Sequence, residues 1–244
     1  MLRRLERGFG LAMRAVPRPL RYRAALLLAR VLAPLIRLSA NGRLQMAYQM
    51  DSAREIALNR VLESMTRNGT TFDPRLKVEG VELLDAALAG AHGTLIVATH
   101  ALMNSMIMRL LLDRGRTITA ITGEPLPIPG TRRRSGVIPL SAGHLFRVRT
   151  ALRDGNVVGA MIDGENLSAR RNVSFDAATG AVHIAPEMLR LAARCGARIV
   201  FLIGRLEGSD IVLALGRPTS EETVAGDFVA FVRAQLAGKE SAGR

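Results

Sequence analysis

The sequence predicts an α/β fold in which helices flank a mixed, mostly parallel sheet. Short, continuous apolar runs, such as TLIVAT at 94–99 and VVGAMID at 157–163, are typical of strands that are buried on both faces. Segments with apolar residues at helical spacing separate these runs, and such alternation favours a parallel sheet. Because no long linker interrupts residues 44–244, we expect one domain there, preceded by a basic helical segment over residues 1–43.

Each element follows from its local pattern. Helices are expected where apolar residues recur at helical spacing, and Pro186 and Gly196 mark the two ends of one of them. The expected helices span residues 44–68, about 81–90, 102–112, 145–153, 186–194 and 221–236. The expected strands span residues 94–99, 117–122, 136–140, 157–163, 199–204 and 210–216, the last two joined as a hairpin around EGS. The turn-rich stretch NGTTFDPRL at 68–76 predicts a break in regular structure.

The charge of the chain narrows the choice of partner. The formal net charge is +13, and nearly all the positive charge is arginine, since Lys77 and Lys239 are the only lysines. Arginine matches the geometry of phosphate, so the composition suits nucleic acid, anionic lipid headgroups or an acidic carrier protein. Aromatic residues make up 4% of the chain, and no zinc or RNA-binding signature occurs, which argues against nucleic acid. The single Cys195 excludes a disulfide framework within the chain.

Residues 1–43 differ from the rest of the chain. They carry ten arginines and one acidic residue, Glu6, with apolar residues between them. The longest apolar run, AALLLARVLAPLI at 24–36, is interrupted by Arg30 and Pro34 and is shorter than the roughly 20 residues that cross a bilayer. The pattern predicts basic amphipathic helices that lie in the plane of an anionic membrane surface. The alternative is a pair of ordinary surface helices that pack on the core.

Three polar residues follow predicted strands. His100 comes after 94–99, Glu124 after 117–122 and Asp163 after 157–163. In open α/β sheets, functional groups gather at the carboxyl ends of the strands, so these three residues are candidates for a common site. The alternatives are a capping or buried histidine at His100 and, because Asp163 precedes a glycine, a turn residue there.

Three consecutive arginines, Arg132, Arg133 and Arg134, lie in a loop rich in proline and glycine. They are interpreted either as a patch that binds phosphate or a carrier protein near the mouth of the site, or as a solvated charged loop. No cluster of Asp, His or Cys has the spacing of metal ligands, so we expect neither a metal nor a dissociable cofactor.

Several segments together resemble a known family. They are the strand that ends in His100, the strand that ends in Asp163, the stretch FDAATGAVHIAPEM at 175–188 and LAARCGARIV at 191–200. Their order resembles the bacterial late acyltransferases of lipid A biosynthesis, which are related to the glycerolipid acyltransferases. The resemblance implies that His100 is the general base for attack of an acceptor on an acyl thioester. It also implies a donor carried by acyl carrier protein or coenzyme A, and a location at the cytoplasmic face of the inner membrane.

The sequence departs from that family at one position. The family has an Asp or Glu five residues after the histidine, where this chain has Ser105, preceded by Asn104. The acid fixes the imidazole tautomer and stabilises the imidazolium, and its loss from a comparable triad costs about 10⁴ in rate. Ser105 can orient the ring through a hydrogen bond but brings no charge. Asp163 and Glu124 are the candidate replacements.

The favoured interpretation is a membrane-associated acyltransferase with His100, Ser105 and Asp163 as catalytic residues. Asn104, Glu124 and the three loop arginines are then expected to bind substrate. The alternative is a catalytically degenerate relative that binds lipid or a partner protein. An ester or thioester hydrolase is a weaker hypothesis, because no G-x-S-x-G motif follows a strand.

Overall fold

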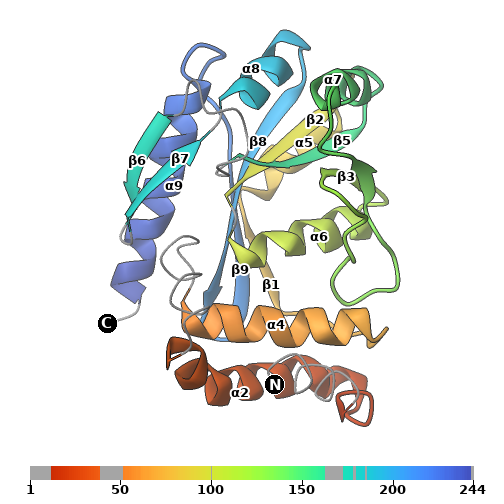
Figure 1. Cartoon of the computed structure of the whole chain (residues 1–244), viewed down its shortest axis with the longest axis vertical. Helices are drawn as coiled ribbons and strands as arrows, with labels where there is room; N and C mark the ends of the chain where they lie inside the picture. Colours follow the sequence, from red (N-terminus) through yellow and green to blue (C-terminus); the bar gives the residue numbers. More distant parts are fainter. Residues whose placement is uncertain are drawn as a thin grey trace.

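A mixed sheet lies at the centre of the computed structural model (Figure 1). The structure describes residues 12–38, 52–99, 101–162, 173–177, 180–184 and 186–242. Seven of the strands in this part of the chain form one sheet in the order β1-β9-β8-β2-β5-β3-β4. They are β1 (Leu76–Glu79), β2 (Thr94–Ala98), β3 (Ile118–Ile121), β4 (Gly136–Ile138), β5 (Val157–Met161), β8 (Arg198–Glu207) and β9 (Asp210–Gly216).

The pairing within the sheet is mostly parallel. Of these seven strands, only the hairpin partners β8 and β9 run antiparallel, and the other neighbouring pairs are parallel. The α/β fold with a mixed, mostly parallel sheet is therefore confirmed, as is the hairpin around the EGS turn. Ala98, the last residue of β2, lies opposite Met161, the last residue of β5, so the carboxyl ends of these two strands are level. β8 pairs with Ala98 at Leu202 and continues beyond it to Glu207.

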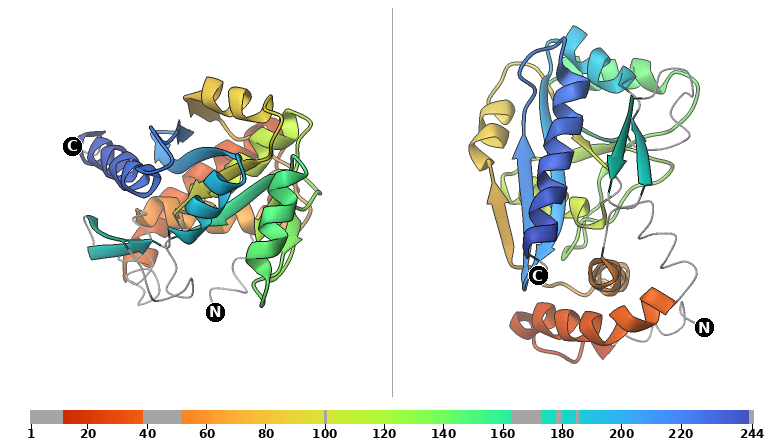
Figure 2. Two further views of the ribbon diagram at one scale, coloured as in Figure 1. Left: turned by 90° about the horizontal axis from the view of Figure 1, so that it is seen from above. Right: turned by 90° about the vertical axis from the view of Figure 1, so that its left-hand side faces the viewer.

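Helices cover both faces of the sheet (Figure 2). One face packs with α4, α5 and α6, and the other with α7, α8 and α9. These helices and their neighbours are α2 (Arg18–Leu38), α4 (Ala53–Arg67), α5 (Val81–Leu88), the 3₁₀ helix η1 (Leu102–Met106), α6 (Ile107–Asp113), α7 (His144–Arg153), α8 (Glu187–Arg194) and α9 (Val224–Ala242). Side chains alternate between the faces, as in β2, where Ile96 and Ala98 join one core and Leu95 and Val97 the other.

The structure differs from the prediction in three elements. The helix expected from residue 102 starts as 3₁₀ structure and becomes α-helical at Ile107. The strand β1 begins where a break was expected, and its alternating pattern of half-buried and exposed residues hides it from a search for apolar runs. The third difference is a separate antiparallel hairpin that was not predicted. It consists of β6 (Val173–Ala177) and β7 (Gly180–Ile184) and lies beside α9 (Figure 1).

Helix α4 begins at a capping box. The Ser52 hydroxyl accepts a hydrogen bond from the Glu55 amide (3.2 Å), and the Ser52 amide donates to Glu55 Oε2 (2.7 Å). This reciprocal pair satisfies two of the amides that a helix start leaves without partners. The other oxygen of Glu55 accepts from the Leu206 amide of β8 (2.9 Å), so the same carboxylate ties α4 to the sheet.

Helix α2 packs on the outside of α4, which separates it from the sheet (Figures 1 and 2). Its inner face is buried, and the phenol of Tyr22 donates to the Ser209 carbonyl in the β8–β9 turn (3.0 Å). In the part of the chain that the structure describes, no helix is long and apolar enough to cross a membrane. The boundary proposed after residue 43 lies outside the described residues.

Candidate functional site

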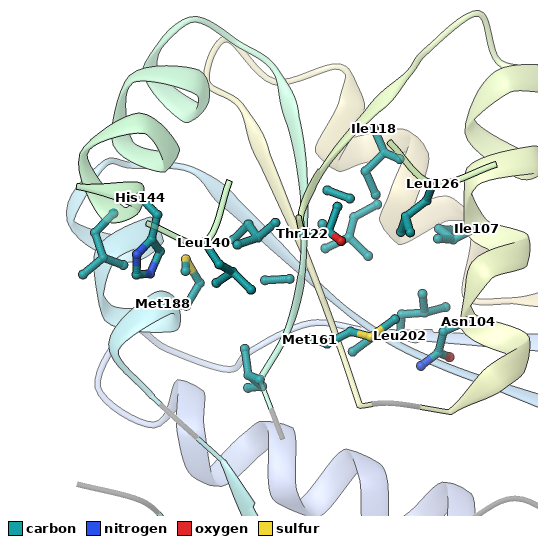
Figure 3. A pocket seen from close by; sticks show the side chains of 18 of the residues that line it. Asn104, Ile107, Ile118, Thr122, Leu126, Leu140, His144, Met161, Met188 and Leu202 are labelled. Atoms are coloured by element: carbon teal, nitrogen blue, oxygen red, sulfur yellow. The ribbon is translucent and has the colours of Figure 1, made fainter. Parts of the chain in front are cut away.

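A cavity of about 1010 Å³ opens at the carboxyl ends of β2, β3 and β5 (Figure 3). Its walls also include residues of η1, α6, α7 and α8, so it extends from one face of the sheet to the other. Most of the lining is apolar, with Ile96, Ile107, Met108, Ile118, Leu126, Leu140, Leu145, Met161, Met188 and Leu202 among the larger side chains. This is the edge of the sheet at which the sequence predicted a site.

Small residues on the strands leave room for this cavity. Ala98, Ala120 and Gly159 lie on three adjacent strands, and all three line it. A β-carbon at Gly159 would lie 2.6 Å from the Cδ1 atom of Ile118, so the absence of a side chain there lets the isoleucine lie across the strand. The cavity therefore depends on short side chains near the strand ends.

Few polar side chains interrupt the apolar lining. They are Asn104, Ser105, Thr122, Ser141, His144 and Glu187. Among the described residues that line the cavity, Glu187 alone carries a carboxylate, and no arginine or lysine does so. Across the described part of the chain, no group of three or more His, Cys, Asp or Glu residues is arranged to hold a metal ion. The cavity suits a largely apolar ligand with a few polar atoms.

Asn104 is the most firmly held of these polar residues. It is buried, its Nδ2 donates to the Thr99 carbonyl (2.7 Å), and its Oδ1 accepts from the Gly204 amide (2.5 Å). A β-carbon at Gly204 would lie 2.6 Å from the carbonyl carbon of Met103, so η1 and β8 approach closely. The side chain predicted to bind substrate therefore binds the backbone of Thr99, after β2, and of Gly204 in β8.

Ser105 lies on the 3₁₀ helix, is partly exposed and lines the cavity. The two other residues predicted to be catalytic, His100 and Asp163, lie outside the described residues. Their chain neighbours are described: Thr99 and Ala101 are buried on either side of His100, and Ile162, just before Asp163, lines the cavity.

The remaining predicted substrate-binding residues do not line the cavity. Glu124 is exposed in the loop after β3. Arg133 and Arg134 are exposed further along the same loop, where Arg134 donates to the Pro125 carbonyl (3.2 Å). Arg132 lines a different hollow. The structure thus brings Asn104 and Ser105 together in the cavity and sets Glu124 and the three arginines outside it.

Two titratable residues of the cavity, His144 and Glu187, were missed by the sequence analysis. The Nδ1 atom of His144 lies 3.1 Å from the Ser141 carbonyl, which can only accept, so Nδ1 donates and Nε2 is the basic nitrogen. Glu187 begins α8, and its Oε2 atom is buried with no hydrogen-bond partner among the described residues. Both residues stand at helix starts, and that position is the one signal that could have singled them out.

The fold and the site define an α/β protein with an apolar cavity at the carboxyl edge of its sheet. A scan against protein-family models and a search of curated proteins find no match for the chain.

Proposed function

We propose that the protein is a membrane-associated acyltransferase of the lipid A late-acyltransferase type. It moves a fatty acyl group from a thioester of acyl carrier protein or coenzyme A to a hydroxyl or amine of a lipid-like acceptor. The observation that carries the proposal is the large apolar cavity at the carboxyl edge of the sheet, with Ser105 in its wall. Each CH₂ group that leaves water for such a cavity contributes about 0.8 kcal/mol to binding.

The proposed chemistry needs one base. His100 removes the proton of the acceptor hydroxyl or amine as that group attacks the thioester carbonyl. The C–S bond then breaks, and the leaving thiolate takes the proton from the imidazolium, so the products are an ester or amide and a free thiol. Ser105 orients the ring, and Asp163 is the candidate carboxylate that stabilises the imidazolium.

The exposed face of α2 supports membrane association. Large apolar side chains recur along it at intervals of three, four or seven residues, and their exposed fractions range from 46% to 76%. They are Leu20, Leu27, Val31, Leu35 and Leu38, and we call them the α2 stripe. At about 100° per residue, the stripe lies opposite the buried face that contacts α4.

Arginines border the α2 stripe. Arg23, Arg30 and Arg37 are exposed and seven residues apart, so they follow one flank of the helix between its buried and exposed faces. An apolar face with flanking arginines is typical of a helix that lies in the membrane interface and extends its charges to the headgroups. This pattern supports membrane association. With the resemblance to the late acyltransferases, we propose a location at the cytoplasmic face of the inner membrane, as a peripheral or monotopic protein.

The experiment is transfer of a labelled acyl group from acyl carrier protein into extracted membrane lipid. Wild type should give labelled lipid and His100→Ala should lose it, whereas His92→Ala, the same change at an exposed histidine, should retain it. Equal transfer by wild type and His100→Ala would refute the base assignment.

Ser105, which lies in the cavity wall and replaces the family acid, favours a second candidate function. If the missing carboxylate has abolished catalysis, the protein binds lipid or a partner protein without turnover. Binding of an acyl thioester by wild type, with no transfer from any of several donors, would favour this alternative.

A further inference from the structure

A second hollow, of about 480 Å³, lies apart from the apolar cavity and shares no lining residue with it. It is formed by three segments that are distant in the sequence: the start of α2 with the turn that precedes it, the loop after α4 and the loop after β3. Its lining consists of Arg14, Arg21, Asn68, Gly69, Thr70, Thr71 and Arg132. The described lining therefore combines three arginines with small polar residues and has no carboxylate.

Two of these arginines are fixed by backbone carbonyls. Arg21 donates from Nε to Val16 (2.8 Å) and from Nη1 to Thr71 (2.9 Å), and Arg14 donates from Nη2 to Asn68. Arg21 also donates from Nη1 to the Thr71 hydroxyl (3.5 Å) and from Nη2 to the Arg14 carbonyl (3.2 Å), which leaves one of its five N–H groups for a ligand. The bond to Asn68 uses one N–H group of Arg14. The hollow thus has positioned donors before any ligand arrives.

The loop after β3 brings the third arginine to the hollow. The loop folds back on itself, with the Ile128 amide donating to the Arg133 carbonyl (3.0 Å). Gly130 has a positive φ of 72°, and a β-carbon there would lie 2.5 Å from the Phe72 carbonyl oxygen. Only glycine permits this approach, which sets Arg132 against the loop after α4.

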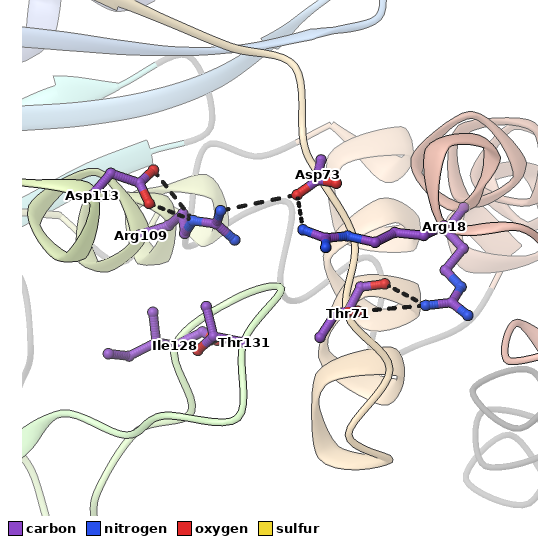
Figure 4. A network of polar contacts seen from close by, with 8 residues as sticks. Arg18, Thr71, Asp73, Arg109, Asp113, Ile128 and Thr131 are labelled. Atoms are coloured by element: carbon purple, nitrogen blue, oxygen red, sulfur yellow. Dashed lines mark hydrogen bonds and ion pairs between the residues drawn. The ribbon is translucent and has the colours of Figure 1, made fainter.

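Neighbouring arginines show a different arrangement (Figure 4). Arg18 pairs with Asp73 (2.8 Å), and Arg109 pairs with Asp113 (3.0 Å) and lies 3.9 Å from Asp73. In the described part of the chain, by contrast, no carboxylate pairs with any of the three arginines of the hollow. A bound anion would relieve the repulsion between these arginines, and their planar forks match phosphate oxygens.

We propose that this hollow binds the phosphate group of a membrane phospholipid. A headgroup fits better than a soluble phosphate because Arg21 belongs to α2 itself, and the exposed α2 stripe begins at the adjacent Leu20. A bilayer that contacts the stripe presents its phosphates at the flanks of the helix. The inference rests on the membrane association proposed above, and it does not depend on acyl transfer.

The test compares Arg132→Gln with Arg133→Gln in the full chain. Both side chains are exposed in one loop and the changes remove equal charge, but only Arg132 lines the hollow. Binding is measured by co-sedimentation with phosphatidylcholine vesicles that contain phosphatidic acid, and by titration with inorganic phosphate. Arg132→Gln should weaken both about ten-fold, as expected for loss of a charge-assisted contact, and Arg133→Gln should weaken neither by more than about two-fold.

Equal losses in the two variants would overturn the proposal, because they would indicate diffuse attraction of a basic protein to an anionic surface. A selective loss with inorganic phosphate but not with vesicles would overturn the headgroup as the ligand. If labelled-lipid transfer fails while the selective loss is seen in both assays, the acyltransferase function is refuted and the phosphate site stands.

Discussion

The side chain of Asn104 accepts a hydrogen bond from the backbone amide of Gly204, which lies 100 residues further along the chain. The Nδ2 atom of the same Asn104 side chain donates to the Thr99 carbonyl, so this buried side chain joins the end of β2, η1 and β8. His100 lies in the sequence between Thr99 and η1. Asn104 therefore anchors Thr99, the neighbour of the proposed base in the sequence, to β8, and the next residue, Ser105, lines the cavity.

Replacing Asn104 should destabilise the fold. Asn104→Ala leaves the Gly204 amide and the Thr99 carbonyl without these partners, and each buried unsatisfied group costs about 1–3 kcal/mol. We expect the free energy of unfolding to fall by about 2–5 kcal/mol, measured by urea denaturation followed by circular dichroism. The same change at the exposed Asn156 should have little effect, and equal losses at both sites would contradict the anchoring role.

The buried strands could be predicted because each carries its own signal. β2 and most of β5 are buried along their length, so their sequences are continuous apolar runs that need no knowledge of neighbouring elements. β1 has no such signal, since Lys77 and Glu79 are exposed and paired with charged residues, and the strand exists through its pairing with β9. Local pattern thus identifies central strands more readily than edge strands.

Restoring an acid at position 105 should raise activity if the protein is an acyltransferase. Ser105→Glu brings a carboxylate to the cavity wall at the position of the family acid, where it can stabilise the imidazolium of His100. The rate of acyl transfer should increase by at most about 10⁴-fold, which is the loss of rate when the carboxylate of a Ser-His-Asp triad is removed. Activity is measured as kcat/KM. The control is Ser141→Glu, which places a carboxylate elsewhere in the cavity wall and should not raise kcat/KM. An identical response of both variants would argue against a His100–acid pair.

Filling the cavity should shift the preference for acyl chain length. Ala120 lines the cavity from β3, and Ala120→Leu reduces the space available to the chain. Each CH₂ group that is excluded should lower kcat/KM for long acyl donors about four-fold, the equivalent of about 0.8 kcal/mol. Ala86→Leu, on the exposed face of α5, is the matched control. Unchanged chain-length profiles in both variants would mean that the acyl chain binds elsewhere.

The edge of the sheet that holds the site was predictable, but most of the polar residues in the cavity were not. The expectation that functional groups gather at the carboxyl ends of β2, β3 and β5 led to the edge at which the cavity opens. His144 and Glu187 enter the same cavity from helix starts, and their approach depends on how α7 and α8 pack. Likewise, three consecutive arginines look equivalent in the sequence. Of the three, only Arg132 lines the second hollow, because the chain turns at Gly130 and brings Arg132 against the loop after α4.

Substitutions on the exposed face of α2 should weaken membrane binding, whereas substitutions on its buried face should lower stability. Leu27 and Val31 are 62% and 69% exposed, whereas the adjacent Leu26 is 6% exposed and faces α4. The double variant Leu27→Ala/Val31→Ala should bind phosphatidylcholine vesicles at least about ten-fold more weakly and lose at most about 0.5 kcal/mol of unfolding free energy. Leu26→Ala should cost about 2–5 kcal/mol of stability and leave vesicle binding of the folded protein intact. Vesicle binding that is insensitive to the double variant would rule out the α2 stripe as the contact.

The start of α9 should contribute stability that depends on pH. The Thr219 amide donates to Asp227 Oδ2 (2.6 Å), and the Thr223 hydroxyl donates to the same oxygen (2.8 Å), so the pKa of Asp227 lies below its usual range. Because the folded-state pKa is depressed, the carboxylate stabilises the fold fully above its unfolded pKa of about 3.9. That contribution is lost as the pH falls through the lower, folded-state pKa.

Asp227→Asn should therefore lower the free energy of unfolding at neutral pH by about 1 kcal/mol or less, since water screens this partly exposed group. The difference between variant and wild type should shrink as the pH falls below about 3.9, because protonation removes the same charge from the wild type. Urea denaturation at neutral and acid pH measures both values. Glu222→Gln, at an exposed residue just before the helix, should change the stability by less than about 0.5 kcal/mol at neutral pH. A deficit of Asp227→Asn that stays constant into acid would mean that the lost contact is steric and not ionic.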